Sequence, residues 1–160
     1  MAIPRSLRLV LLAVTTLWLV PGALLAQEQE RKITQADLPA AVAKGVAVQS
    51  QGATLKGLAE EKEAGQTYYE AELLAGGLTR DLLFDTTGTV VEIEQQVVFD
   101  SLPPAVRSAL TTRAGQGTIV QVESLTKRGS LVAYEAHVKT NGKSSEIQVG
   151  PTGEALAHEE

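Results

Sequence analysis

The chain has 160 residues, a formal net charge of −5 at pH 7 and no cysteine. The absence of cysteine rules out a disulfide framework. An acidic chain without a basic stripe lacks the positive charge that neutralises phosphates, so the composition argues against a nucleic-acid partner.

The first 26 residues have the pattern of a secretory signal peptide. Arg5 and Arg8 form a positive start, residues 9–20 are apolar, and Ala26 is a small residue suited to cleavage before Gln27. The alternative is an uncleaved anchor helix, but the apolar run is shorter than the roughly 20 residues that span a bilayer. We therefore predict a bacterial protein that is periplasmic or secreted, with no membrane insertion after cleavage.

After a polar lead-in at residues 27–32, which we expect to be loose, the remaining chain has the length of one domain. Its central stretch, residues 67–95, predicts three strands. Apolar and polar residues alternate in it with a period of two, which is typical of a strand with one buried face. Gly76-Gly77 and Asp85-Thr86-Thr87-Gly88 interrupt the alternation, and both segments suit tight turns.

The last third of the chain repeats this stretch at a distance of 65 residues. Tyr69-Glu70-Ala71 corresponds to Tyr134-Glu135-Ala136, and Gly88 corresponds to Gly153. Asn141-Gly142, a strong hairpin signal, stands where Gly76-Gly77 stood. The recurrence of turns and apolar positions indicates an internal duplication.

A helix is predicted before each copy. Leu38, Val42 and Val46 are spaced by four residues, as are Leu102, Val106 and Leu110. Another strand follows each helix, at residues 53–58 and 119–123, and an acidic turn follows the first of these at residues 60–65. A short last strand is expected at residues 154–158.

The sequence therefore predicts an α+β fold of two α-β-β-β-β repeats, with helices on one face of an antiparallel sheet. The repeats span residues 27–98 and 99–160. Because each half alone would be near the size limit for a stable domain, we expect the halves to share one core or one sheet.

Short motifs recur in both halves. In the first half they are Leu38-Pro39, Tyr69-Glu70-Ala71-Glu72 and Asp85-Thr86-Thr87-Gly88-Thr89-Val90, and in the second half Leu102-Pro103, Tyr134-Glu135-Ala136 and Pro151-Thr152-Gly153-Glu154-Ala155. This unit resembles the PepSY domain, in particular the tandem PepSY-like proteins that are related in fold to beta-lactamase inhibitor protein. The chain departs from the pattern at Gly150, where an Asp is expected, so the second turn should be looser.

The resemblance implies an exported or membrane-associated protein that binds or restrains a peptidase, or that acts as an extracytoplasmic sensor. It implies no catalytic residues. The residues agree with this. A Ser-His-Asp set can be written from Ser130 or Ser145 with His137, but no nucleophile motif supports it. We expect a protein that is not an enzyme and that uses no cofactor.

No metal centre is predicted either. Zinc needs three or four converging ligands, and the two histidines, His137 on the wet face of a strand and His158 in an acidic tail, are far apart in the sequence.

One group of polar residues is expected to share a face of the sheet, and it is our candidate interaction face: Tyr68, Glu70, Glu72, Glu92 and Glu94. Such a face can be merely solvated, can attract a basic partner, or can bind Ca²⁺ weakly, although Ca²⁺ prefers six or more oxygens from a loop.

The leading hypothesis is a binding module that contacts another exported protein or peptide. The contact would use this sheet surface or an open edge strand. The alternative is an extracytoplasmic binder of a small ligand or cation.

Overall fold

The computed structural model describes residues 29–158 and residue 160. The predicted signal peptide, residues 1–26, lies outside this part of the chain. Within it, no helix is long and apolar enough to cross a membrane.

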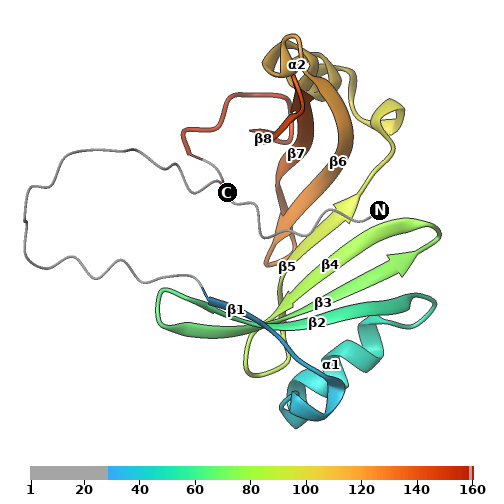
Figure 1. Cartoon of the computed structure of the whole chain (residues 1–160), viewed down its shortest axis with the longest axis vertical. Helices are drawn as coiled ribbons and strands as arrows, with labels where there is room; N and C mark the ends of the chain where they lie inside the picture. Colours follow the sequence, from blue (N-terminus) through green and yellow to red (C-terminus); the bar gives the residue numbers. More distant parts are fainter. Residues whose placement is uncertain (1–28, 159) are drawn as a thin grey trace, which may run out of the picture.

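The architecture is one antiparallel sheet of eight strands in sequential order (Figure 1). The strands are β1 Gln29–Lys32, β2 Thr54–Glu63, β3 Gln66–Ala75, β4 Leu78–Phe84, β5 Val90–Gln96, β6 Thr118–Lys127, β7 Ser130–Thr140 and β8 Lys143–Val149. The helices are α1 Ala40–Gln49 and α2 Pro104–Ala114, each preceded by a 3-10 turn, at Gln35–Asp37 and Phe99–Ser101. β1 and β8 are the edge strands.

The prediction of an α+β fold with two α-β-β-β-β repeats is wrong. The described chain is mostly one continuous sheet with only two α-helices, and the segment at residues 154–158 forms no strand. Glu154 instead forms part of the preceding turn, because its carbonyl oxygen accepts a hydrogen bond from the Gly150 amide at 2.8 Å. The Glu154 carboxylate also bonds Thr152, so this residue closes a turn where a fourth strand was expected to begin.

Two further segments differ from expectation at the other end of the sheet. The lead-in expected to be loose contains β1, which pairs with β2 from Gln29↔Lys62 to Lys32↔Ala59. The expected acidic turn at residues 60–65 is instead the end of β2, which continues to Glu63. The turn is reduced to Ala64 and Gly65, both with positive φ, as in the tight turns that join twisted hairpin strands.

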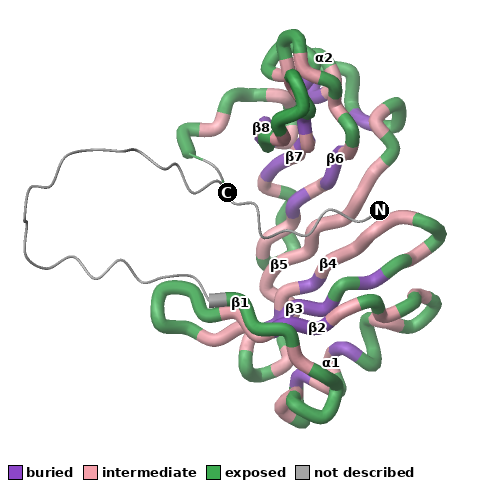
Figure 2. Tube along the Cα trace, viewed as in Figure 1, coloured by how far each residue is buried: buried purple, intermediate pink, exposed green. Residues whose placement is uncertain are grey.

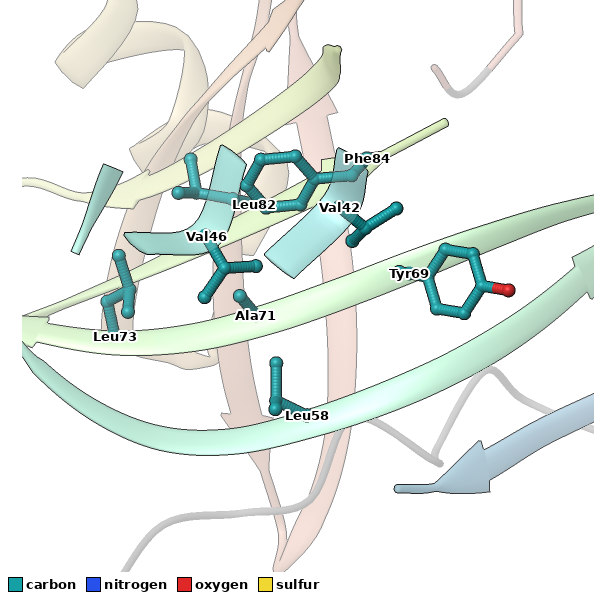
Figure 3. Packing of buried hydrophobic residues seen from close by; sticks show 8 residues of the cluster. All are labelled: Val42, Val46, Leu58, Tyr69, Ala71, Leu73, Leu82 and Phe84. Carbon is teal, nitrogen blue, oxygen red and sulfur yellow. The ribbon is translucent and has the colours of Figure 1, made fainter. Parts of the chain in front are cut away.

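Each helix covers its own part of the sheet and forms its own hydrophobic cluster. The first cluster contains Val42, Val46, Leu58, Tyr69, Ala71, Leu73, Leu82 and Phe84 (Figure 3). The second contains Leu102, Val106, Leu110, Val122, Ala136, Val138 and Val149. Buried segments accordingly lie at both ends of the molecule, beside α1 and beside α2 (Figure 2). The halves therefore share one sheet, and each packs its own helix.

Both helices lie on the same face of that sheet. Residues paired across neighbouring strands share a face, and so do alternate residues along one strand. Leu82 of the first cluster pairs with Ile93, and Ile93 pairs with Thr126. Val122 of the second cluster lies four residues before Thr126 and so has the same orientation. The opposite face carries no helix of the described chain, and we call it the helix-free face.

Two glycine turns set the distance between each helix and the sheet. Gly88 and Gly153 have positive φ, and their α-carbons face the backbone at the start of a helix. A side chain at Gly88 would collide with the carbonyl of Ala41, and one at Gly153 would lie 2.7 Å from the Ala105 carbonyl oxygen. The equivalent turns therefore hold both helices at backbone-contact distance.

The second turn is closed by a different residue from the first. In the first turn the Asp85 carboxylate accepts bonds from the amides of Thr87 and Thr89, at 2.9 and 3.0 Å. In the second, where Gly150 replaces the aspartate, the Glu154 carboxylate accepts from the Thr152 amide at 2.8 Å. A side chain on Gly150 would overlap the Glu154 carboxylate, so the second turn has a carboxylate acceptor supplied from its other end.

Gly45 in α1 gives room to the Phe84 ring. A β-carbon at Gly45 would lie 2.7 Å from the Gly88 carbonyl oxygen and 3.0 Å from the ring. In the second half the corresponding residues are Ala109 in the helix and Val149 in the sheet. The half with the larger sheet residue, Phe84, thus has the smaller helix residue, Gly45, and the half with the smaller Val149 has the larger Ala109.

We predict that Gly45→Ala destabilises the protein by up to about 2 kcal/mol. The gain in helix propensity from Gly to Ala is about 1 kcal/mol, but overpacking against backbone costs about 1–3 kcal/mol. Ala109→Gly should also destabilise, by at least about 1 kcal/mol, because it lowers helix propensity and removes a methyl group packed against the second cluster. Urea unfolding of both variants measures the effects, and an increase in stability for Gly45→Ala would contradict the packing argument.

Candidate functional site

The structure places all five residues of the candidate interaction face on the helix-free face. Two rows of paired residues show this, and the rows are Glu70–Leu83–Glu92 and Glu72–Asp81–Glu94. Tyr68 pairs with Glu61 and alternates with Glu70 along β3, so it points the same way. Glu72 is exposed, whereas Glu70 is only 5% exposed. A partner can therefore reach Glu72 on this face more easily than Glu70.

The helix-free face continues into the second half through the β5–β6 pairing. Glu92 pairs with Lys127, Glu94 with Leu125, and Gln96 with Glu123. Carboxylates on the helix-free face include Glu61, Glu70, Glu72, Asp81, Glu92, Glu94, Glu123, Glu135 and Glu146, and lysines include Lys32, Lys127 and Lys139. The face therefore has an excess of negative charge across both halves.

His137 lies at the centre of a compact polar cluster on this face, formed by β6, β7 and β8. Its Nε2 atom is 3.1 Å from Oε2 of Glu123 and 3.6 Å from Oε1 of Glu135. Its Nδ1 atom is 3.5 Å from Oε1 of Glu146. We call His137 and these three glutamates the His137 cluster.

The carboxylates of Glu123 and Glu135 are each held by a glutamine. Gln121 donates to Oε1 of Glu123 at 3.0 Å, and Gln148 donates to Oε2 of Glu135 at 2.7 Å. The side-chain oxygen Oε1 of Gln148 accepts a hydrogen bond from the backbone amide of Glu160 at 2.8 Å. The end of the described chain thus contacts the helix-free face beside the cluster.

Two groups of the cluster have raised pKa values, each for a different main reason. The hydrogen bond to Glu123 raises the pKa of the His137 imidazole, and the negative charges of Glu123, Glu135 and Glu146 add to this effect, while burial opposes it. Burial raises the pKa of the Glu135 carboxyl, although the Gln148 hydrogen bond acts in the other direction. The cluster therefore favours a positive charge at its centre.

Sequence reasoning missed this cluster, although part of it could have been found. The Asn141-Gly142 turn sets the β7–β8 register, which pairs His137 with Glu146 and Glu135 with Gln148. The partners on β6 could not be found in this way. The β6–β7 register shifts twice, between Ile119 and Gln121 and between Leu125 and Thr126.

The serines considered for a Ser-His-Asp set lie apart from this cluster. Ser145 pairs with Val138 and therefore lies on the helix-covered face, opposite to His137. Ser130 is the first residue of β7, remote from His137 along the strand. His158 lies after β8, outside the cluster.

A pocket of about 420 Å³ lies at the C-terminal end of α2 and the start of β6. Its lining includes Val97, Phe99, Ala114, Ile119 and Val122. No residue that lines it carries a titratable side chain, so the pocket offers apolar contact and a few neutral polar groups, from Gln96, Thr111 and Gln121, but no acid or base.

Solved structures with the same fold come from Bacteroides species. A candidate periplasmic protein from Bacteroides eggerthii matches with a TM-score of 0.62 and 20% identity, over 74% of this chain and 86% of that one. A DUF2874 family protein from Bacteroides ovatus matches with a TM-score of 0.58 and 20% identity, over 74% and 84%. A BLIP-like protein from Bacteroides fragilis matches with a TM-score of 0.56 and 22% identity, over 77% and 85%.

The chain therefore has a BLIP-like fold. At these identities the similarity establishes the fold and leaves the activity open. No protein-family model matches the chain, and no curated protein matches it.

We predict that the stabilising contribution of His137 decreases as the pH rises. Because its pKa is raised in the folded state, this contribution is complete below the ordinary value of 6.5 and is lost as the pH passes the folded-state pKa. Urea unfolding between pH 5.5 and 8.5, in buffer with EDTA, should show that His137→Ala costs less stability at the higher pH. The control is His158→Ala, which removes the histidine outside the cluster. A pH-independent cost for His137→Ala would contradict the prediction.

Proposed function

We propose that this chain is an exported, non-catalytic binding module that contacts a basic protein or peptide through its helix-free face. The observation that carries the proposal is the arrangement of the sheet. Both helices cover one face, and the other presents rows of carboxylates across neighbouring strands. A twisted sheet with one such face offers a broad surface on which a partner can lie.

Charge argues for the kind of partner. An excess of carboxylates attracts lysine- and arginine-bearing surfaces, accelerates their encounter and disfavours acidic competitors. The exposed Glu72 and the half-buried Glu92 and Glu94 are accessible to such side chains. Tyr68, which is half-buried on the same face, offers an aromatic contact for the stem of a lysine or for a guanidinium group.

The proposal that the partner is a peptidase comes from the resemblance to the tandem PepSY-like proteins. Leu38-Pro39 and Leu102-Pro103 precede the two helices, and the Asp85–Gly88 turn lies against α1 as a structural element. The name of the BLIP-like neighbour and the description of the B. eggerthii neighbour as a candidate periplasmic protein support an exported module. A peptidase restrained by this face would fit that family.

The test is affinity capture from the exported fraction of the source cell, with protein expressed from the full-length sequence. We predict that Glu72→Gln with Glu94→Gln lowers the affinity for the captured partner roughly tenfold, which corresponds to about 1.4 kcal/mol. Glu70 is left intact because it is buried. Raising the salt concentration from about 0.1 M to 1 M should weaken the same complex, since the Debye length falls from about 10 Å to 3 Å.

The matched control changes the net charge equally on the other side of the molecule. Ser108→Lys with Thr112→Lys adds two positive charges to exposed positions of α2. This variant should keep the affinity of the wild type. Equal loss in both variants, or a complex insensitive to both, would contradict the helix-free face as the binding surface. If no protein partner is captured and a small ligand or Ca²⁺ stabilises the protein, the alternative function would be favoured.

A further inference from the structure

The three side chains at the centre of the His137 cluster are arranged as ligands of a single ion. One ligand atom from each of Glu123, Glu135 and His137 lies within 4.8 Å of the other two. The His137 Nε2 atom is 3.1 Å from the Glu123 oxygen and 3.6 Å from the Glu135 oxygen. In a tetrahedral zinc site with bonds of about 2.0–2.1 Å, neighbouring ligand atoms are roughly 3.4 Å apart. The two distances lie on either side of this value.

Each of the three ligands also has a polar partner beside the atom that would not bind the ion. Gln121 holds the second oxygen of Glu123, at 3.0 Å, and Gln148 holds the second oxygen of Glu135, at 2.7 Å. The Glu146 carboxylate, 3.5 Å from Nδ1, lies where it can hold the proton on that nitrogen and leave Nε2 free as a ligand. Metal-binding histidines in proteins are usually oriented by such a partner on the other nitrogen.

The fold does not require this set of residues, as the first half shows. The pairings that assemble the cluster in the second half have counterparts of the same register in the first. The counterparts of Gln121, Glu123, Glu135, His137, Glu146 and Gln148 are Gly57, Ala59, Glu70, Glu72, Asp81 and Leu83. The same hairpins are therefore built without the histidine, without the β6 carboxylate and without either glutamine.

We propose that Glu123, Glu135 and His137 form a binding site for a divalent transition-metal ion of the zinc class. One imidazole nitrogen and two carboxylate oxygens suit such an ion, whereas Ca²⁺ requires six or more oxygens. The ion would also offset the repulsion between two carboxylates, of which the Glu123 side chain is only 5% exposed. The side chains of Glu135 and His137, 17% and 26% exposed, give the ion a path from solvent. A fourth coordination position remains for water or for a group of a bound partner.

The site can be tested with zinc chloride and protein expressed from the full-length sequence, by isothermal titration at pH 7. We predict one zinc ion per chain and no comparable binding of calcium chloride. His137→Ala and Glu123→Gln should lower the zinc affinity at least about 100-fold. Loss of the outer partners, in Glu146→Gln and Gln148→Leu, should lower it by about 10–100-fold. The affinity of the wild type should fall as the pH is lowered below the pKa of His137, because protons compete for Nε2.

Two controls separate this site from unspecific binding and from misfolding. His158→Ala removes the other histidine of the chain and Glu63→Gln removes an exposed carboxylate away from the cluster, and neither should change the zinc affinity. In wild-type protein, NMR resolves the two imidazoles, and zinc should shift the signals of His137 and leave those of His158. The proposal is overturned if wild-type protein binds no zinc, if His137→Ala binds it equally well, or if only His158 responds.

Discussion

The pairing of β5 with β6 is the interaction on which the whole arrangement depends. The two hydrophobic clusters have no residue in common, and each encloses one helix against its own strands. The ladder from Glu92↔Lys127 to Gln96↔Glu123 joins the halves into one sheet. Because an antiparallel ladder preserves the orientation of paired side chains, it also places both helices on the same face. The opposite face is thereby shared by both halves.

Helices cover only one face of this sheet, and the charged groups on the other face are mainly carboxylates. Repulsion among like charges is the cost, and the structure reduces it locally. Lys127 is 4.0 Å from Glu92 and 3.9 Å from Glu160, and His137 lies among three glutamates. The acidic surface is thus a set of partly compensated groups, and the His137 cluster is its most organised part.

The two halves retain one scaffold and differ in what they add to it. The scaffold consists of the helix stripes, the turn glycines Gly88 and Gly153, and the hairpins. Differences arise where one half compensates for a local change. Val149 with Ala109 replaces Phe84 with Gly45, and Glu154 supplies the carboxylate that Asp85 supplies in the first turn. The polar cluster of the second half is a difference of another kind, because the first half forms the same hairpins without such a cluster.

Much of the sheet could be predicted from local signals. The alternation in residues 67–95 predicts three strands, and the structure has β3, β4 and β5 there. It also groups Tyr68 with the four glutamates, which do lie on one face. Whether that face binds a partner stays a prediction. Local signals failed at the edges, because β1 is a polar segment that becomes a strand only by pairing with β2, and residues 154–158 lack a strand because their first residue closes a turn.

The sequence by itself led us to predict an exported protein, and it located the Gly76-Gly77 and Asp85–Gly88 turns and the side chains that share a face along the strands between them. These properties follow from residue type and from a period of two, which need no distant contact. Only the tertiary structure decided that the halves form one sheet, that both helices lie on the same side, and that Glu123 meets Glu135 and His137. The physical reason is register. Between the β6–β7 turn and these residues, the pairing passes an irregularity at Leu125/Thr126, which changes which residues face one another.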